Sequence, residues 1–577
     1  MADSPPTLIQ YSHWGRRIDQ LQTSEGWRRL KEIAIEEGLV SISYERRYGE
    51  WSRVYAFAKA LLFTGEGRVV GCPISMTDGC ARVLELLGTP EMQRTVMERL
   101  ITSDSVYAFT SGQFMTERPG GSDVSLTETV ARPVEGEPDC WLPGAKYRLT
   151  GFKWFSSATD SQVALALART GDPSQGSRTL SLFLLPLRLP LPDPEMPTPS
   201  DLLPRTNDLA DGEPINNGIE IHRLKSKIGT HALPTAELSL NNSLAYLVGP
   251  LNGGVKAISP VLQITRLHSA FHSVGNLARA LGIATSFAKV RQIDGGRRVL
   301  VDVPLHMSTL ASVAVTYRAL LSFALSTAHL LGQVEDGGMS EESFASVQAR
   351  FRLLNPTLKA FAAHHAVPAM EECMAALGGQ GYMEETGIGR LIRDALVERI
   401  WEGTENVLAL DLVRATVKGG SAMVGHWTRW ATAILRSAEQ QKGAADDGGG
   451  GLRTDGDHQE GIRSLKEVVL AIPAVFEEMA RHEGMAHLSL LLFGHSNAAL
   501  YLLEHAVWAD RVGEAEAPVH WDAFARWTVD GGVRGVGLPG LLARFDRSRG
   551  KAGPGRARED RAIVCGGQFQ PNEKSKL

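Results

Sequence analysis

The chain has 577 residues, of which 43% are hydrophobic and 22% are charged, with a formal net charge of −5 at pH 7. This length exceeds what one compact domain usually holds, so the composition predicts a globular protein of several packed domains and excludes a fibre. The net negative charge supplies no overall positive field for phosphate backbones or anionic lipid, so nucleic acid is not the expected partner.

The chain offers no sign of a disulfide framework. Its five cysteines (Cys72, Cys80, Cys140, Cys373 and Cys565) are odd in number, widely spaced and without a C-x-x-C pair, which also argues against a structural zinc site. The first residues show no basic segment followed by an apolar one, and no apolar run is expected to reach membrane-spanning length, so no membrane partner is expected.

Helical spacing dominates the first part of the chain. Apolar residues recur at helical intervals between about residues 26 and 112, for example at Trp51, Val54, Phe57 and Leu61. We therefore expect an N-terminal helical domain over residues 1–112.

The pattern then changes to short runs rich in β-branched and aliphatic residues. Tyr147–Leu149, Gln162–Leu167 and Leu180–Leu185 are such runs, separated by Gly, Pro and Asp. Residues 113–245 are therefore expected to form a small β-domain. The proline-rich and acidic stretch Leu187–Asn217 is expected to be a long surface excursion between its strands.

Helical spacing returns at residues 254–292, 303–332, 340–377 and 388–418, which predicts a bundle of four helices over residues 246–418. A flexible linker with four consecutive glycines is expected over residues 419–460. A helical extension over 461–548 and a disordered tail over 549–577 complete the predicted organisation, which is mainly α with a central small β-domain.

One carboxylate stands in a setting suited to proton abstraction. Glu402 follows Trp401 and precedes Gly403, downstream of the glycine pair Gly378–Gly379, and such glycines let the backbone approach a ligand closely. The alternative reading is an ordinary solvated glutamate at the end of a helix.

Two further motifs lie upstream, Met115-Thr116-Glu117-Arg118-Pro119-Gly120-Gly121-Ser122-Asp123 and Lys153-Trp154-Phe155-Ser156. Together with the Glu402 segment they resemble, in the same order, the motifs of the acyl-CoA dehydrogenase family. Gly15-Arg16-Arg17-Ile18-Asp19 and Cys72-Pro73-Ile74-Ser75-Met76-Thr77 are similar to the AidB-like subgroup. The resemblance spans roughly residues 8 to 418.

The resemblance implies a helical domain, a β-barrel-like domain and a four-helix bundle, with FAD as cofactor and an acyl-CoA thioester as substrate. It gives Glu402 the removal of the alpha proton while the beta hydride passes to flavin N5. The cofactor residues that it implies are Thr116, Gly121, Ser122, Trp154, Ser156, Arg291, Gly378, Gly379, Thr404 and Asn406. On the substrate side it implies Arg266, Trp401 and Gly403.

The chain departs from the family pattern at three places that bear on these sites. Asp294-Gly295 stands where the family has Phe-Gly, Ala375 where it has Gln or Glu, and His231 where it has arginine. The first two concern the adenosine end of the cofactor and the third the substrate or the hinge of the β-domain. His268 and His272 are spaced to share one helix face, but no carboxylate motif accompanies them, so no metal is predicted.

The last three residues, Ser575, Lys576 and Leu577, match a peroxisomal import signal and predict binding to the import receptor and a peroxisomal location. A homodimer or homotetramer is expected. Electrons leave either to oxygen or to a flavoprotein partner, and the acyl chain is left open.

Two other functions compete with desaturation. One is a protective, nucleic-acid-binding flavoprotein of the AidB type, for which a basic C-terminal region would be expected. Residues 420–577 instead carry 19 Lys plus Arg against 20 Asp plus Glu. The other is an interaction scaffold that keeps the fold without the chemistry.

Overall fold

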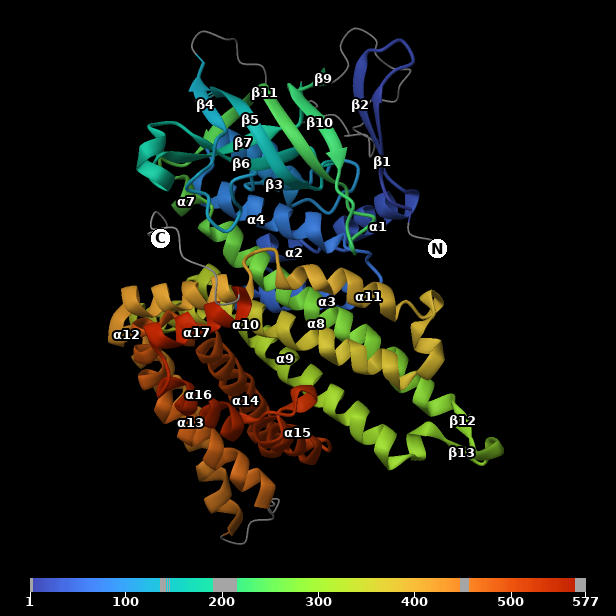
Figure 1. Ribbon diagram of the computed structural model, residues 1–577, viewed down its shortest axis with the longest axis vertical. Coiled ribbons are helices and arrows are strands. Elements are labelled where there is room, and N and C mark those ends of the chain that lie inside the picture. The colour runs from blue at the N-terminus through green and yellow to red at the C-terminus, as the bar shows by residue number, and fades with distance from the viewer. Residues whose placement is uncertain are drawn as a thin grey trace. The chain divides into compact units, whose positions relative to one another are not determined.

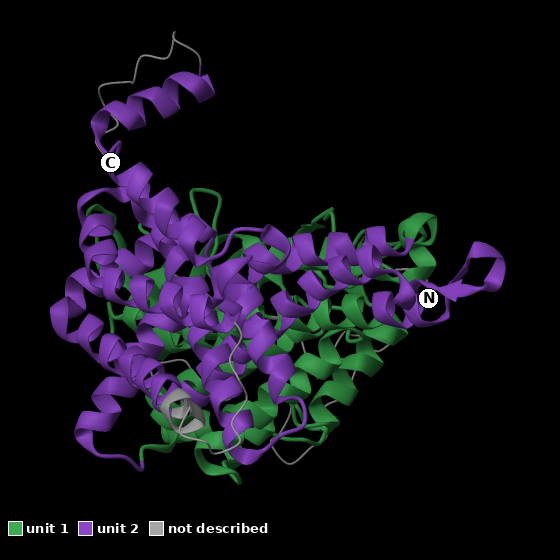
Figure 2. Cartoon of the chain, turned by 90° about the horizontal axis from the view of Figure 1, so that it is seen from below, with its two compact units in different colours: residues 1–282, 331–337, 378–402 green, residues 283–330, 338–377, 403–577 purple. Residues whose placement is uncertain are grey.

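The computed structural model describes residues 4–134, 142, 144, 146–189, 215–446 and 456–565. The chain divides into two compact units, coloured separately in Figure 2. Unit 1 comprises residues 1–282, 331–337 and 378–402, and unit 2 comprises residues 283–330, 338–377 and 403–577. Each unit is therefore assembled from segments that lie far apart in the chain.

Unit 1 begins with an antiparallel hairpin of β1 (Thr7–Tyr11) and β2 (Arg17–Gln22), not with a helix. Helical spacing starts only after Ser24, whose hydroxyl caps the first helix by accepting a hydrogen bond from the Trp27 amide at 3.2 Å. The helices that follow are α1 (Glu25–Glu36), α2 (Ser41–Glu45), α3 (Ser52–Thr64), α4 (Gly71–Leu87), α5 (Pro90–Met92) and α6 (Glu98–Leu100).

The β-domain of unit 1 closes on itself (Figure 1). Strand β7 pairs with both β11 and β6, so the path β11-β5-β4-β6-β7 returns to β11 as a small barrel. Strands β3 and β10 add to β6 and β11. The strands are β3 (Ser111–Phe114), β4 (Val130–Pro133), β5 (Lys146–Ser157), β6 (Val163–Arg169), β7 (Leu180–Pro186), β10 (Ile219–Leu224) and β11 (Thr235–Val248).

Strands β6 and β7 are buried on both faces, which explains why they read as continuous apolar runs. In β6, Leu165 and Leu167 pack into a core shared with α4, whereas Ala164 and Ala166 pack into the core inside the barrel. Because side chains alternate along a strand, neighbouring residues of β6 serve two different cores. The remaining short strands are β8 (Arg188–Leu189) with β9 (Ile215–Asn216), and β12 (Gln292–Ile293) with β13 (Arg298–Val299).

Long helices make up most of the rest. Two of them contribute to both units, since α8 crosses from unit 1 into unit 2 after Gly282 and α9 returns to unit 1 at Leu331. The helices from residue 254 to 446 are α7 (Gly254–Ala257), α8 (Ser259–Val290), α9 (Pro304–Asp336), α10 (Glu341–Ala376), α11 (Ile388–Ala395) and α12 (Glu405–Asp446).

The C-terminal extension of unit 2 is helical over a wider range than the sequence predicts. Residues 419–446, expected in a flexible linker, continue α12 after a break at Gly420 (φ 60°), because Ala, Leu and Trp keep helical spacing there. The four consecutive glycines lie outside the described residues. The further helices are α13 (Gly456–Arg481), α14 (Ala486–Val512), α15 (Ala517–Val529), α16 (Leu538–Arg549) and α17 (Pro554–Cys565).

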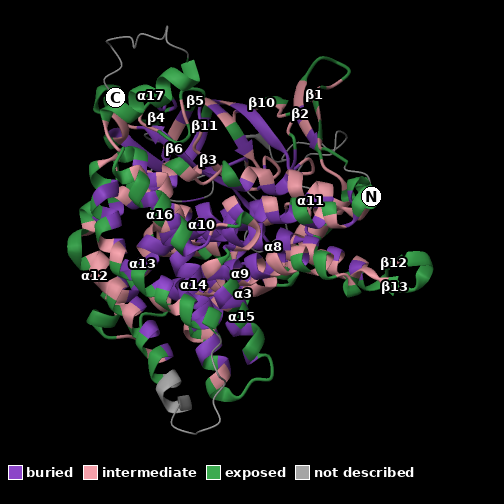
Figure 3. Cartoon of the chain, turned by 60° about the horizontal axis from the view of Figure 1, so that its bottom comes forward, coloured by how far each residue is buried: buried purple, intermediate pink, exposed green. Residues whose placement is uncertain are grey.

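Helix α17 occupies part of the predicted disordered tail. It buries no residue, so its formation follows from local helix propensity of Ala, Arg and Glu and not from apolar periodicity, which the sequence lacks there. By contrast, α14 is buried along most of its length (Figure 3).

Two helices are long and apolar enough by composition to cross a membrane, contrary to the expectation from the sequence. They are Pro304–Asp336, with a mean hydropathy of 1.3, and Glu483–Val512, with a mean hydropathy of 1.2. The protein itself buries 83% of the apolar window in the second helix and 44% in the first, so the second is a core helix of unit 2.

Candidate active site

The predicted catalytic glutamate lies where helical structure is interrupted. The segment 388–418 is not one helix, because α11 ends at Ala395 and α12 begins only at Glu405. Between them Glu402 has φ 57° and Gly403 has φ 104°, both in the left-handed region. For a glutamate this conformation costs about 1–2 kcal/mol, and such strain recurs at active sites.

The carboxylate of Glu402 is held from α8. The Thr265 hydroxyl donates a hydrogen bond to Oε2 of Glu402 at 2.7 Å, and Nε of Arg266 donates to its backbone oxygen at 3.3 Å. Arg266, expected on the substrate side, therefore contacts the backbone of the turn. Glu402 is half-buried, so a ligand can reach a carboxylate whose orientation is already restrained.

A second carboxylate, that of Glu398, forms a hydrogen bond with the turn through Trp401. It is buried and accepts hydrogen bonds at Oε2 from the Trp401 indole at 2.5 Å and from the Ser269 hydroxyl at 2.6 Å. His272 Nδ1 lies 3.4 Å from its other oxygen. Trp401, predicted on the substrate side, is thereby fixed at its polar end, while its ring packs against the core cluster that contains Cys72 and Ala158.

Unit 2 holds the residues that follow Glu402. The buried Lys359 of α10 donates a hydrogen bond to the backbone oxygen of Gly403 at 2.6 Å. The Thr404 hydroxyl accepts a bond from the Val407 amide at 3.5 Å, so it acts as the cap of α12. Asn406 is exposed. The contact of Lys359 has no signal in the sequence, since lysines on helices are usually solvated.

A buried ion pair joins the two predicted flavin motifs. Lys153 Nζ lies 2.6 Å from Oε1 of Glu117, and both side chains are almost fully buried. Burial raises the pKa of Glu117, but the charge of Lys153 and hydrogen bonds from Thr129 and the Glu128 amide outweigh it and lower that pKa. Glu117 and Lys153 stand in the two upstream motifs, and neither was expected to contact the cofactor.

The backbone brings the same motifs into contact at the predicted flavin residues. The Trp154 amide donates to the Thr116 backbone oxygen at 2.9 Å. A Cβ atom on Gly121 would lie 2.9 Å from the Thr116 side chain, so only glycine fits this approach without displacement. Gly121 and Ser122 are exposed, and the Trp154 ring carries Lys225 Nζ at 3.2 Å from its centre.

Ser156 is the clearest sign of a missing partner. It is fully buried at the end of β5, yet its hydroxyl has no hydrogen-bond partner among the described residues. Buried hydroxyls are nearly always paired, so Ser156 has the capacity for one further hydrogen bond.

The remaining predicted cofactor residues lie on exposed backbone. Gly378 (φ 61°) and Gly379 begin a 3-10 helix over Gly378–Tyr382, and a Cβ atom on either would meet nothing within 4 Å. Arg291 is exposed at the end of α8 in unit 2. Open space around these residues is compatible with a ligand, and their roles stay predictions.

Arg393 and Asp394, in α11, contact a loop of the β-domain. Asp394 accepts a hydrogen bond from the Thr230 amide at 2.6 Å, and a Cβ atom on Gly229 would lie 2.2 Å from the Arg393 oxygen. His231, which replaces the family arginine, lies 2.8 Å from the Lys227 backbone oxygen. Burial lowers the pKa of Lys227 to about 8.

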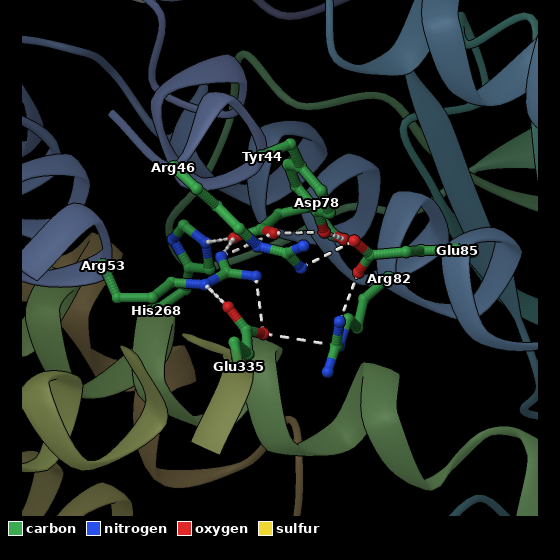
Figure 4. Close-up of polar contacts among 8 residues, drawn as sticks. All are labelled: Tyr44, Arg46, Arg53, Asp78, Arg82, Glu85, His268 and Glu335. Atoms are coloured by element: carbon green, nitrogen blue, oxygen red, sulfur yellow. Dashed lines mark hydrogen bonds and ion pairs between the residues drawn. The ribbon is translucent and has the colours of Figure 1, made fainter. Parts of the chain in front are cut away.

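Unit 1 contains a network of charged side chains that includes His268 of α8 (Figure 4). Arg53 contacts Asp78 at 2.8 Å and Glu335 at 2.6 Å, and all three are almost fully buried. His268 Nε2 lies 2.9 Å from Asp78. His268 and His272 thus face two different carboxylates, Asp78 and Glu398, and their spacing reflects packing within unit 1.

Three sequence profiles cover most of the chain. That of the AidB N-terminal domain matches residues 2–105, that of the acyl-CoA dehydrogenase middle domain matches residues 112–243, and that of the acyl-CoA dehydrogenase C-terminal domain matches residues 252–417.

Individual proteins agree with the profiles. Acyl-CoA dehydrogenase family member 11 of Caenorhabditis elegans is 40% identical over 419 residues, covering 71% of this chain and 62% of the relative. The match therefore spans less than two thirds of that relative's length. The putative acyl-CoA dehydrogenase AidB of Escherichia coli strain K12 is 28% identical over 427 residues, covering 72% of this chain and 70% of AidB.

A solved structure extends the similarity into the C-terminal helices. The crystal structure of Caenorhabditis elegans ACDH-11 in complex with C11-CoA has a TM-score of 0.81 and 31% identity, and covers 98% of this chain and 87% of that one. The predicted fold class, including the helical extension, is confirmed. The chain belongs to the acyl-CoA dehydrogenase family and carries an AidB-type N-terminal domain.

Proposed function

We propose that this protein is an FAD-dependent oxidoreductase that introduces an alpha,beta double bond into an acyl-CoA thioester, with Glu402 as the base that removes the alpha proton. The observation that carries the proposal is the Glu402 turn. A strained glutamate, half-exposed and hydrogen-bonded by Thr265 at 2.7 Å, is a carboxylate held in one orientation and accessible to a ligand.

The reaction requires the carboxylate to lie beside the carbon acid and away from competing water. Thr265 restrains Glu402, while Glu398 fixes Trp401 and Lys359 fixes Gly403, so both flanks of the base are anchored. A carboxylate held in this way can take the alpha proton at Oε1 or Oε2.

The residues of unit 1 fit a flavin. The buried hydroxyl of Ser156 without a partner, the close Thr116–Gly121 approach and the exposed Gly121–Ser122 backbone would hold it, and membership of the family implies FAD. When bound, FAD supplies the acceptor for the beta hydride.

For the substrate, the similar Caenorhabditis elegans protein in its crystal structure holds C11-CoA. We therefore propose coenzyme A thioesters of straight, medium-length acyl chains as substrates, with undecanoyl-CoA as the first probe. Longer, shorter and branched thioesters form the comparison set.

The experiment is anaerobic mixing of the FAD-loaded protein with each thioester while flavin absorbance is followed. Wild type should lose its oxidised flavin absorbance, and Glu402→Gln should keep it while binding the same amount of FAD and thioester. If no thioester bleaches wild type, the desaturation proposal fails and the protective AidB-type function becomes the better account.

Air admitted after reduction distinguishes the two electron acceptors. Rapid reoxidation with stoichiometric peroxide supports an oxidase, and slow reoxidation that an electron-transferring flavoprotein accelerates supports a dehydrogenase. The sequence and the described residues favour neither.

Location and assembly remain predictions. Ser575, Lys576 and Leu577 lie outside the described residues. A fluorescent protein fused ahead of residues 549–577 should accumulate in peroxisomes and should lose this location when the last three residues are removed. Light scattering of the purified protein tests the expected homodimer or homotetramer.

A further inference from the structure

Three metal-ligating side chains converge in unit 2, outside the residues discussed above as cofactor or substrate site. His364 of α10, Glu405 at the start of α12 and His487 near the start of α14 place one ligand atom each within 4.8 Å of one another. His364 Nδ1 and His487 Nε2 both lie 3.0 Å from the same oxygen, Oε2 of Glu405.

We propose that these three residues bind one zinc-class divalent ion through Nδ1 of His364, Oε2 of Glu405 and Nε2 of His487, with water as the fourth ligand. Two imidazoles and a carboxylate are a common ligand set for Zn²⁺, which prefers four ligands in tetrahedral geometry.

The observed separations fit such an ion with small movements. Bonds of about 2.0–2.1 Å in a tetrahedron place ligand atoms about 3.3 Å apart. The two imidazole-to-carboxylate distances of 3.0 Å need to lengthen by only a few tenths of an ångström. The two imidazole nitrogens, which lie within 4.8 Å of each other, need to reach about 3.3 Å.

The three ligand side chains differ in exposure, and this difference leaves a path by which an ion can enter. The side chains of His364 and Glu405 are 16% and 11% exposed, whereas that of His487 is 42% exposed. Two ligands are therefore held inside unit 2, and the third opens to solvent, from which an ion and its water can enter.

The backbone around the ligands is fixed by other contacts. Arg534 Nη2 donates to the backbone oxygen of His364 at 2.6 Å, and Lys359 Nζ donates to that of Gly403, two residues before Glu405. These cations, with the positive ends of α12 and α14, oppose a bound cation. The Glu405 carboxylate offsets one charge, and coordination bonds are stronger than the contribution of a helix end.

A second cluster in unit 2 provides the contrast. The ligand atoms of His505, Glu514 and His520 also lie within 4.8 Å of one another. The Glu514 side chain, however, is 40% exposed, and its carboxylate lies 3.6 Å from His520. Arg318 Nη1 lies 3.4 Å from Nδ1 of His520, so a cation already occupies the place beside that ring. This cluster carries no proposal and supplies a matched control.

The site differs from the absence of metal expected from the sequence. Its ligands lie 41 and 82 residues apart and form no spacing motif. Because Glu405 follows Glu402 by three residues, a bound ion would fix the start of α12 directly after the turn and tie it to α14 of the C-terminal extension.

The test uses the FAD-loaded full-length protein after treatment with a chelator. Co²⁺ is titrated as a spectroscopic probe, followed by displacement with Zn²⁺. Wild type should bind one Co²⁺ per chain with the intense visible bands of a tetrahedral site, and Zn²⁺ should abolish them. His487→Gln should weaken Zn²⁺ binding about 100-fold or more, because a ligand is lost.

His505→Gln in the second cluster should leave Zn²⁺ affinity unchanged. His487 is partly exposed, so its replacement should fold, which circular dichroism and FAD content check independently. Binding that is equally tight in wild type and His487→Gln overturns the proposal, and so does a Co²⁺ spectrum without tetrahedral bands.

Discussion

The buried network around Asp78 and the turn that carries Glu402 belong to the same unit and use the same kinds of side chain in opposite ways. Asp78 is 1% exposed and receives hydrogen bonds from Arg53, Tyr44 and His268. Glu402 is half-buried and has a strained backbone. Loss of one partner from a buried, paired set of charges destabilises a fold, whereas a charge held in strain at an accessible position is suited to chemistry.

The substitution Glu402→Gly tests whether Glu402 serves catalysis and not stability. We expect the rate of flavin reduction by a thioester substrate to fall by about 10²–10⁴, because a general base is lost. The free energy of unfolding should stay within about 1 kcal/mol of wild type, since glycine accepts the left-handed region and offsets the lost bond to Thr265. Stopped-flow absorbance and urea unfolding measure the two effects, and a large loss of stability would assign Glu402 to structure.

The converse is expected for Asp78→Asn. It removes the charge opposite Arg53 in a fully buried site, so the free energy of unfolding should fall by about 3–5 kcal/mol. Flavin reduction by the folded fraction should remain near wild type.

Glu85→Gln is the matched control, because Glu85 contacts Arg46 and Arg82 at the more exposed edge of the same network. Glu85→Gln should lower the free energy of unfolding by about 1 kcal/mol or less. Equal losses in the two variants would show that burial of Asp78 adds nothing.

Acid should weaken the same network only at low pH, after most other carboxylates have taken up a proton. Burial raises the pKa of Asp78, but the charge of Arg53 and the contact with His268 outweigh it and bring the pKa to about 2. Because the folded pKa is below the unfolded value, this stability is present above about pH 4 and is lost as pH falls toward 2, amounting to about 2 kcal/mol. Denaturation midpoints measured between these values should fall in wild type and stay flatter in Asp78→Asn.

The smallest expected effect concerns Ser156. Ser156→Ala should weaken FAD binding about three- to tenfold, the loss of one hydrogen bond, while leaving the stability of the FAD-free protein unchanged or higher. Ser157→Ala loses the contact with Thr235 at 3.0 Å. It should lower the stability of the FAD-free protein and leave the affinity for FAD unchanged. Titration of FAD-free protein with FAD, followed by flavin fluorescence, separates the two, and equal affinities for wild type and Ser156→Ala would remove Ser156 from the cofactor site.

Sequence reasoning reaches the fold class because its signals are local and periodic. The continuous apolar run of β6 and the helical spacing of α8, α9 and α10 are patterns within single elements. Pro356 and Pro368 inside α10 do not end that helix, because burial on unit 2 outweighs their local effect. The hairpin at Thr7–Gln22 has no such periodicity and was predicted as part of a helical domain.

Site residues can be predicted from the sequence only where they stand in a recognisable motif. Glu402 and Ser156 stand in such motifs, but Thr265, Glu398 and Lys359 do not. Lys359 contacts a residue 44 positions away and Ser269 contacts Glu398 over 129 positions, so no spacing in the chain announces them. Contacts of this kind depend on tertiary packing.

The interleaving of the two units constrains how the chain folds during synthesis. Arg53 meets Glu335 only 282 residues later, and the last segment of unit 1 ends at Glu402. A nascent chain that has emerged only to residue 282 therefore lacks Glu335, one of the two carboxylates that pair with the buried Arg53, and also lacks Glu398. Fragments that stop before residue 402 should be held by chaperones or degraded. Truncation at the apparent domain boundary near residue 245 should therefore leave no stably folded protein.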